Sequence, residues 1–206
     1  MRVNVRAVVV TVAASSFLVA GCTTVNVSNP PVNPSASSSI PTEGGGGAMM
    51  DGDAYMSDVM FAQMMIPHHR QAIEIAELAP ARGASQDILD LALKISAAQG
   101  PEIEQMQVML DRWGAPSMMD DHSGHGGMAM VGMVSDEDMD ALRQASGADF
   151  ERLFLELMIA HHEGAIAMTE DPLANGGDPE MRALLLAIVA AQTAEIDTMK
   201  AMLEGR

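Results

Sequence analysis

Two pairs of adjacent histidines are the residues in this sequence best suited to chemistry. His68 and His69 form the first pair, and His161 and His162 form the second. A neutral imidazole is a common ligand for transition metals, and its charge changes near neutral pH. On a helical projection all four histidines flank an apolar side, so we expect them to be buried. Because a buried imidazole without a partner costs free energy, these positions predict a metal site, a proton-handling site or a polar network.

Other polar residues are expected to face the histidines from neighbouring helices. Gln99 and Glu102 stand within one apolar stripe, and Gln192 and Glu195 stand within another. With a turn near position 82, Glu102 lies roughly 9 Å beyond the level of the first histidine pair by helical rise. A direct contact within one hairpin therefore needs long side chains, and contact across hairpins is the alternative. The glutamines and glutamates either support a metal site as its outer shell or complete a polar network that fixes helix register.

A segment rich in methionine and histidine separates the two histidine pairs. Thioethers suit Cu(I) and imidazoles suit Cu(I) or Cu(II), so copper is the best match and another transition metal is the alternative. The candidate ligands of this segment are Met118, Met119, His122, His125, Met128, Met130 and Met133. The competing interpretation is a glycine-rich linker with incidental methionines.

Further methionines stand close to the histidine pairs and near the start of the expected domain. Met65 and Met158 each precede a histidine pair by about one helical turn. Taken alone they are core side chains, and their proximity to histidine makes them candidate ligands. A weaker cluster of thioethers consists of Met49, Met50, Met56 and Met60.

The sequence contains no residue set for a recognised enzyme. Di-iron bundles use Glu-x-x-His from two helices, but no Glu stands three residues before any of the four paired histidines. There is also no His-Glu-x-x-His run and no nucleophile with an evident base. We therefore predict no catalytic residues; a metalloenzyme would need an open coordination position and a substrate pocket.

The elements that position these residues come from an internal duplication. Phe61 through His69 reappears as Phe154 through His162, 93 residues later, and the same offset continues without a gap to Leu110 and Leu203. Over positions 61–110, 21 of the 50 aligned pairs are identical. Similar helical composition does not explain this many identities, so the sequence indicates two copies of one unit.

Each copy is predicted to be two helices joined by a turn. The expected helices are Asp53–Ala79, Ala84–Trp113, Asp149–Thr169 and Pro179–Leu203. Proline and glycine interrupt the pattern between the helices of each copy, and short turns imply antiparallel neighbours. Two such hairpins bury their apolar stripes most simply against each other, which predicts an all-α four-helix bundle.

Charge and composition limit the classes of partner. The chain has 206 residues, a formal net charge of -17, 20 methionines and 3% aromatic residues. This acidity argues against a nucleic-acid or anionic-membrane binding surface, and a single cysteine rules out a disulfide framework. The interior is therefore expected to consist of aliphatic, alanine and methionine side chains.

The N-terminal region has the organisation of an export signal. Residues 1–21 combine basic residues, an apolar stretch and a final Val-Ala-Gly triplet before Cys22. This order predicts a lipoprotein signal peptide, with thioether lipidation and acylation at Cys22 and cleavage just before it. Residues 22–50, rich in Ser, Pro and Gly, are predicted to tether the domain 51–206 to the outer face of the cell membrane.

The predicted domain divides into three parts. Residues 51–113 form the first hairpin, residues 114–135 form the Met/His-rich linker, and residues 136–206 form the second hairpin. An incidental cysteine at position 22, after an ordinary signal or uncleaved anchor, is the alternative interpretation of the N-terminus.

The histidine segments carry a family resemblance. Residues 65–73, with Met-Ile-Pro-His-His, and residues 158–168, with Met-Ile-Ala-His-His, resemble the bacterial domain-of-unknown-function family 305. The resemblance spans both hairpins and implies a ferritin-like fold, export from the cytoplasm and, for some members, copper binding and tolerance. The second copy has Ala160 where the first has Pro67.

Together these features predict an exported, membrane-tethered protein that sequesters or delivers copper through Met and His. The alternative function is a metal-independent structural or interaction module, in which the buried His, Gln and Glu residues only fix the bundle.

Overall fold

The computed structural model describes residues 52–117 and 131–206, and every regular element within these ranges is a helix. The elements are α1 (Gly52–Leu78), the 3-10 helix η1 (Ala79–Arg82), α2 (Gln86–Trp113), α3 (Asp136–Gln144), α4 (Gly147–Met168), α5 (Glu170–Asn175) and α6 (Pro179–Glu204). The predicted all-α fold is confirmed. The predicted signal peptide, the predicted lipidation site Cys22 and the whole of the predicted tether, residues 22–50, lie outside these ranges. No helix in the described part is both long and apolar enough to cross a membrane.

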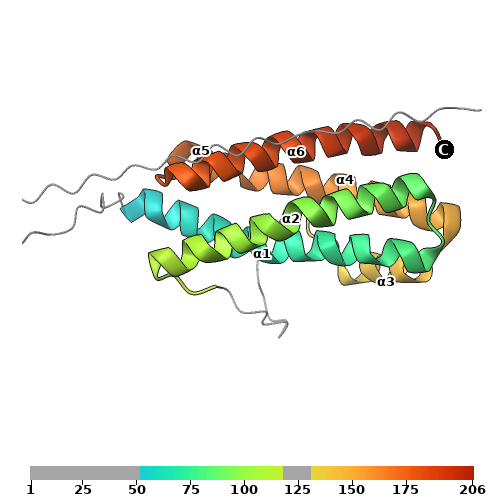
Figure 1. Ribbon diagram of the computed structural model, residues 1–206, viewed down its shortest axis with the longest axis horizontal. Coiled ribbons are helices and arrows are strands. Elements are labelled where there is room, and N and C mark those ends of the chain that lie inside the picture. The colour runs from blue at the N-terminus through green and yellow to red at the C-terminus, as the bar shows by residue number, and fades with distance from the viewer. Residues whose placement is uncertain (1–51, 118–130) are drawn as a thin grey trace, which may run out of the picture. The chain divides into compact units, whose positions relative to one another are not determined.

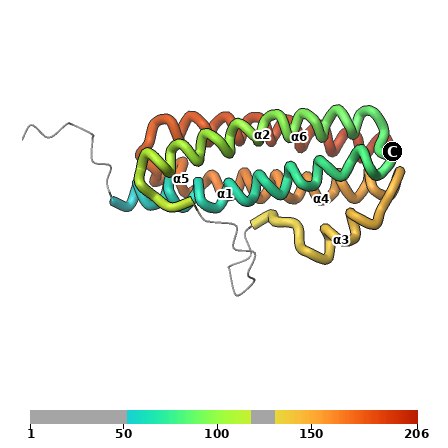
Figure 2. Tube along the Cα trace, turned by 60° about the horizontal axis from the view of Figure 1, so that its bottom comes forward, coloured from blue at the N-terminus to red at the C-terminus, as the bar shows by residue number. Residues whose placement is uncertain are grey.

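The four long helices form a bundle of two hairpins. Helix α1 packs mainly on α2 and α4 packs mainly on α6, while α1 and α4 also contact each other. Figure 1 shows the antiparallel pairs, and in Figure 2 α2 and α6 lie in one layer above α1 and α4. The expected four-helix architecture of two tandem hairpins is therefore confirmed.

The helix ends follow from local chemistry. After α1 the chain continues into η1, which contains Pro80, and leaves it at Gly83 with a φ of 69°. Helix α2 is followed by Gly114, whose φ of 68° is easily adopted only by a residue without a side chain. Helix α6 begins with Pro179 after Asp178, whose carboxylate accepts hydrogen bonds from the first backbone N–H groups of the helix.

Two short helices were not predicted from the sequence. Helix α3 lies at the start of the stretch assigned to the second hairpin, and α5 lies within the segment expected to be a plain turn. The signal for α3 is its N-cap, because the Ser135 hydroxyl accepts a hydrogen bond from the backbone N–H of Asp138. A serine followed three residues later by an acid is a known signal for the start of a helix. The sequence therefore contained a signal for α3.

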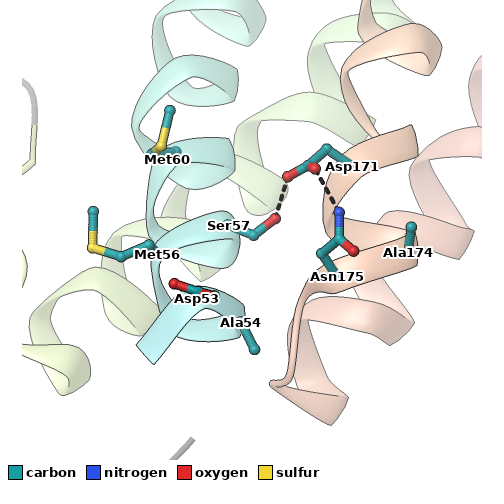
Figure 3. Close-up of a pocket in the computed structure, with 8 residues that line it drawn as sticks. All are labelled: Asp53, Ala54, Met56, Ser57, Met60, Asp171, Ala174 and Asn175. Carbon is teal, nitrogen blue, oxygen red and sulfur yellow. Dashed lines mark hydrogen bonds between the residues drawn. The ribbon is translucent and has the colours of Figure 1, made fainter. Parts of the chain in front are cut away.

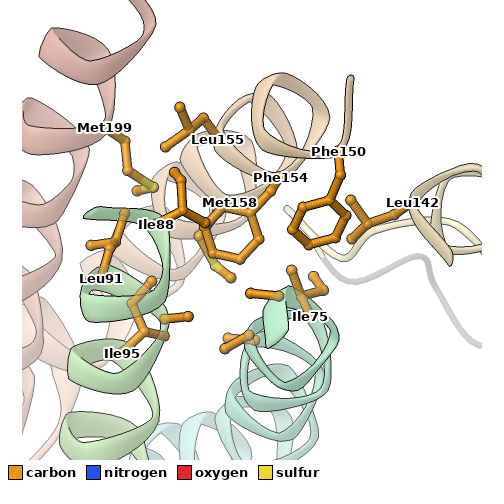
Figure 4. Packing of buried hydrophobic residues seen from close by; sticks show 14 of the residues in the cluster. Ile75, Ile88, Leu91, Ile95, Leu142, Phe150, Phe154, Leu155, Met158 and Met199 are labelled. Atoms are coloured by element: carbon orange, nitrogen blue, oxygen red, sulfur yellow. The ribbon is translucent and has the colours of Figure 1, made fainter. Parts of the chain in front are cut away.

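The core consists of two apolar clusters separated along the bundle. One cluster takes Ile75 from α1, Ile95 from α2 and Phe154 from α4, and Figure 4 shows this packing. The other takes Phe61 from α1 and Met106 from α2. The paired histidines and glutamines stand between these clusters in the sequence of each hairpin, so the bundle has a polar layer across its middle.

Acidic residues at the two ends of the bundle tie one hairpin to the other. The buried Asp58 carboxylate of α1 accepts hydrogen bonds from the backbone N–H groups of Gly177 (2.9 Å) and Asp178 (2.8 Å). Burial raises the pKa of Asp58 above its ordinary value, and these two hydrogen bonds oppose the shift. At the offset of 93 residues, Glu151 of α4 accepts a hydrogen bond from the Ser85 backbone N–H (2.6 Å). Each carboxylate thus accepts a hydrogen bond from the backbone N–H of the residue that precedes a long helix of the other hairpin.

Candidate metal-binding layer

The polar layer contains two matching His–Glu pairs. His69 Nε2 donates a hydrogen bond to Glu102 at 2.7 Å, and His162 Nε2 donates one to Glu195 at 2.7 Å. Both contacts lie within one hairpin and span 33 residues. In a helix, side chains lean toward the N-terminus of that helix. In an antiparallel pair the two side chains therefore lean toward each other, which closes the offset of roughly 9 Å expected from helical rise.

Two imidazoles from different hairpins meet at the centre of the layer. The rings of His68 and His161 have centroids 3.8 Å apart and planes inclined by 39°. His68 is 0% exposed and His161 is 1% exposed. These two positions are equivalent under the offset of 93 residues. The duplication therefore brings one histidine from each copy into direct contact.

Several nitrogen atoms of this layer have no hydrogen-bond partner in the part of the chain that the structure describes. They are the Nδ1 atoms of His68, His69 and His162 and both ring nitrogens of His161. Where Nε2–H donates to a carboxylate or a carbonyl, the neutral ring carries its lone pair on Nδ1. The layer therefore presents buried nitrogen lone pairs, which is the form of histidine that binds a metal ion.

Burial keeps the two central histidines neutral. Desolvation is the largest cause that lowers the pKa of His68, to about 4, followed by the nearby His69, while the Val131 carbonyl opposes the shift. Desolvation likewise lowers the pKa of His161 well below its ordinary value, and the neighbouring imidazoles lower it further. The backbone of His68 raises the pKa of His161 in part, although its contact with the His161 ring does not meet hydrogen-bond geometry. At neutral pH no proton has to leave either ring before a cation binds.

The two glutamines do not complete a satisfied network. Gln99 and Gln192 are 2% and 3% exposed. Both amide atoms of Gln99 and the Oε1 atom of Gln192 lack a hydrogen-bond partner among the described residues. Buried polar groups are normally paired, and each exception calls for an explanation such as a ligand or an ordered water. The His–Glu pairs therefore fit the interpretation of a polar network whose members hydrogen-bond one another. The centre of the layer does not fit it.

A short stretch of backbone, residues 131–134, covers the central histidines; we call it the strap. His68 Nε2 donates a hydrogen bond to the Val131 carbonyl at 3.2 Å. The Gln71 side chain holds the other end, donating to the Val134 carbonyl and accepting from the Val134 N–H, each at 2.8 Å. The strap belongs to the last part of the Met/His-rich linker, just before α3.

Two glycines allow the strap to lie against α4. A Cβ atom on Gly164 would come within 2.4 Å of the Gly132 Cα. Gly132 has a φ of +83°, and a Cβ atom there would come within 3.0 Å of the His161 carbonyl oxygen and 3.1 Å of the Ala160 carbonyl oxygen. The strap backbone can reach this position only because neither residue has a side chain.

The structure places the remaining predicted ligands as follows. Met65 and Met158 are fully buried and belong to different apolar clusters, on opposite sides of the layer. Met133 is half-buried within the strap. The other linker ligands, Met118, Met119, His122, His125, Met128 and Met130, lie outside the described residues. Within the described ranges, no group of three or more His, Cys, Asp or Glu side chains is arranged to hold a metal ion.

A shallow hollow lies between α1 and α5, away from the histidines. Its volume is about 610 Å³ and its lining includes Met56, Ser57, Met60 and Asp171. In Figure 3 Ser57 points toward Asp171 while Met56 lies on the opposite side of α1. The two methionines are about half exposed. Because the thioethers and the carboxylates do not converge, the hollow does not form a combined soft and hard ligand set.

Of the strap residues only Met133 was predicted to have a role, and the backbone contacts of Val131, Gly132 and Val134 were missed. A backbone carbonyl such as that of Val131 has no signature in a sequence. A usable signal was available at positions 71 and 164, where the offset of 93 pairs a glutamine with a glycine inside otherwise similar helices. An unpaired glycine within a helix often marks a close approach of another backbone.

Comparison with known proteins places this geometry in a family. The chain is similar to a DUF305 fragment from Deinococcus radiodurans, at 36% identity and a TM-score of 0.66, covering 74% of this chain and 99% of that one. A Streptomyces coelicolor DUF305 protein, described as a candidate secreted protein, is 29% identical with a TM-score of 0.66, covering 72% and 93%. CopM in its Cu(II)-bound form is 36% identical with a TM-score of 0.60, covering 72% and 96%.

CopM structures similar to this chain also include Cu(I)-bound and Ag-bound forms. No curated protein matches the sequence. Residues 58–203 match the family described as Domain of unknown function (DUF305), and the chain belongs to that family.

Proposed function

We propose that this protein binds copper through Met and His side chains, on the outer side of the cell membrane, in order to sequester the ion or deliver it. The observation that carries the proposal is the buried layer of imidazoles with unpartnered nitrogens. Its support from outside the chain is the similarity to CopM, which has been crystallised with Cu(II), Cu(I) and Ag.

The chemistry of the layer suits a copper ion. Imidazole nitrogen binds both oxidation states of copper, and thioether sulfur favours Cu(I). A metal-binding histidine commonly donates its second ring N–H to a carboxylate, which orients the ring. His69 with Glu102 and His162 with Glu195 have this arrangement. The Met/His-rich linker would supply additional soft ligands.

The proposed location rests on the N-terminal sequence and on the relatives. The Val-Ala-Gly-Cys end of the apolar stretch resembles a lipidation signal. A relative of 29% identity is described as a candidate secreted protein. We infer that Cys22 anchors the protein to the membrane and that residues 23–50 separate the bundle from it.

A metal-independent structural module is the second candidate function. It is favoured by the two His–Glu pairs, which are hydrogen-bonded without a metal. It is also favoured by the lack of a three-ligand group among the described residues. In this case the layer would only fix the register of the four helices.

A Cu(I) competition titration under anaerobic, reducing conditions distinguishes the two functions. We would use the full chain in detergent and compare it with two variants. The linker variant carries Ser at the four methionines 118, 119, 128 and 130 and Asn at His122 and His125. The layer variant carries Gln at His68, His69, His161 and His162.

Copper binding lost in either variant supports the proposed function and locates the site. Binding no tighter than that of a methionine-poor control protein would overturn it. In that case, unfolding transitions that are identical with copper and with chelator would establish the structural module.

A further inference from the structure

We propose that Met60, Met64 and Met168 form a binding site for a soft monovalent cation, Cu(I) or its analogue Ag(I), where α1 packs against the end of α4. We call these three residues the thioether trio. The inference rests on the proposed function and adds to it a site that lies outside both the histidine layer and the Met/His-rich linker.

Two contacts fix the alignment of α1 with α4 and with α5, which follows α4. The ring of His68 meets the ring of His161, and the Ser57 hydroxyl donates a hydrogen bond to Asp171. The residue numbers add up to 229 in the first contact and to 228 in the second. A nearly constant sum is expected for antiparallel neighbours, since residues at the same level along the axis have it.

The thioether trio lies between these two contacts. By the same sum, Met60 is level with Met168, and Met64 is level with Gly164. Four residues correspond to about 6 Å along a helix. The three methionines therefore stand within about one helical turn of each other along the bundle.

The strap marks the face of both helices on which the trio lies. His68 on α1 donates a hydrogen bond to the strap, and the strap passes closely over Gly164 on α4. Met64 precedes His68 by four residues, and Met168 follows Gly164 by four. Residues four apart share a face of a helix. Met64 and Met168 thus lie on the strap side of the bundle, one turn beyond the strap.

The directions of the side chains bring the sulfur atoms toward a common region. Long side chains in a helix lean toward its N-terminus. Because α1 and α4 are antiparallel, Met64 leans toward the level of Met168, and Met168 leans toward the level of Met64. In Figure 3 the Met60 side chain extends along α1 away from Asp53, which is the direction of the turn that carries Met64.

Exposure distinguishes the trio from methionines that only fill the core. Met60 is 51% exposed, and Met64 and Met168 are half-buried. A fully buried methionine such as Met65 or Met158 is explained by packing alone. The trio is accessible to an ion from solvent without movement of the backbone, whereas the central histidines are not.

The ligand chemistry selects the class of ion. Thioether sulfur is a soft ligand that prefers Cu(I), while Zn(II) and Cu(II) are bound better by imidazole or carboxylate. Three thioethers therefore constitute a ligand set for Cu(I) and for the chemically similar Ag(I). The formal net charge of -17 favours the approach of a cation to this protein.

The first test follows the methionine methyl groups by NMR while Ag(I), a redox-stable substitute for Cu(I), is added. The full chain in detergent would carry carbon-13 in its methionine methyl groups. We expect the methyl resonances of the trio to shift at a lower Ag(I) concentration than those of Met56 and Met202. Trio resonances that shift only together with these two, or not at all, would overturn the inference.

A pair of matched variants tests the same site by stoichiometry. The trio variant carries Leu at Met60, Met64 and Met168, which keeps the apolar volume and removes the sulfur atoms. The control variant carries Leu at three other methionines, which are exposed, buried and half-buried: Met56, Met181 and Met202.

The trio variant should bind one Ag(I) fewer than the unmodified chain, and the control variant should bind the same number. Equal stoichiometry in the two variants would overturn the inference. Circular dichroism would verify folding, and the NMR titration of the unmodified chain decides the question if a variant fails to fold.

A competition experiment tests the class of ion. Zn(II) in about tenfold excess over Ag(I) should leave the shifts of the trio in place, because zinc binds thioethers poorly. Reversal of these shifts by Zn(II) would overturn the assignment of a thioether site.

The outcomes separate the two levels of the proposal. If the trio variant keeps the full copper stoichiometry while the linker or layer variant loses binding, this inference is overturned and the proposed function stands. Copper binding absent from the unmodified chain overturns both.

Discussion

The two copies of the repeat use the same helical position in opposite ways. In the first copy Gln71 holds the strap through two hydrogen bonds to Val134. In the second copy the equivalent residue is Gly164, and the strap passes over it. By contrast, the His–Glu pair is reproduced in both copies with the same distance. The contacts that the two copies share, such as the His–Glu pairs, therefore build the bundle. The difference between Gln71 and Gly164 lets the strap cover the central histidines on one face.

The same comparison holds at the ends of the bundle. Asp58 and Glu151 are equivalent, and each accepts a hydrogen bond from the residue before a long helix of the other hairpin. The details differ, since Asp58 accepts from two backbone N–H groups whereas Glu151 accepts from one and also pairs with Arg206. The repeat therefore preserves the connection between hairpins while its partners vary.

The largest expected effect comes from protonating the central histidines. In the unfolded chain His68 takes up a proton near pH 6.5, but in the folded protein only near pH 4. Between these values the unfolded state binds more protons, so the free energy of unfolding falls as the pH drops from 6.5 to 4. His68 alone contributes a loss of roughly 3 kcal/mol, and His161 adds to it in the same direction. Urea unfolding at pH 7 and pH 4.5 measures the change.

A control variant assigns this loss to the layer. His68→Gln removes the titrating group and should flatten the dependence of stability on pH. If the free energy of unfolding of the variant depends on pH as steeply as that of the unmodified protein, the acid sensitivity arises from groups other than His68.

A second prediction compares the two acids that join the hairpins. Asp58→Ala leaves two backbone N–H groups without their acceptor and should lower the free energy of unfolding by about 2 kcal/mol. Glu151→Ala exposes one such group and should cost about 1 kcal/mol. Urea unfolding of both variants checks the order, and a larger loss for Glu151→Ala would contradict the assigned contacts.

A third prediction sharpens the difference at the strap. Gly164→Ala should destabilise the protein by about 1 kcal/mol, since the cost of the collision with Gly132 exceeds the gain in helix propensity. Gly100→Ala should change stability by less than about 0.5 kcal/mol, because the gain in helix propensity is opposed by Pro101, which disfavours helical backbone at a preceding residue that carries a Cβ. A clearly larger thermal destabilisation is therefore expected for Gly164→Ala. Equal effects of the two substitutions would show that the strap does not press on α4.

The smallest expected effect concerns the element that follows the strap. Ser135→Ala removes the N-cap of α3 and should cost about 0.5–1 kcal/mol. Hydrogen exchange should increase at the first amides of α3 and leave α1 and α2 unchanged. Faster exchange throughout the bundle would contradict a purely local role for this cap.

Much of the fold was predictable because its causes are local in the sequence. The helical periods around Phe61 and Phe154 and the constant offset between them indicate two hairpins, and the structure contains both. Burial of the four histidines was likewise predicted from the apolar flanks and is found. Helix α3 was missed although Ser135 and Asp138 mark its start, because the first helix of the second hairpin was expected to begin only at Asp149.

The sequence by itself determined which side chains face the interior, because a helix repeats every 3.6 residues and its apolar face must be buried. Only the tertiary structure decided which of those side chains meet. The contact of His68 with His161, the hydrogen bond from His68 to the Val131 carbonyl and the approach of Gly132 to Gly164 join residues that are distant in the chain. Such contacts depend on how helices pack and on where backbone atoms lie, and neither is encoded in the period of a single helix.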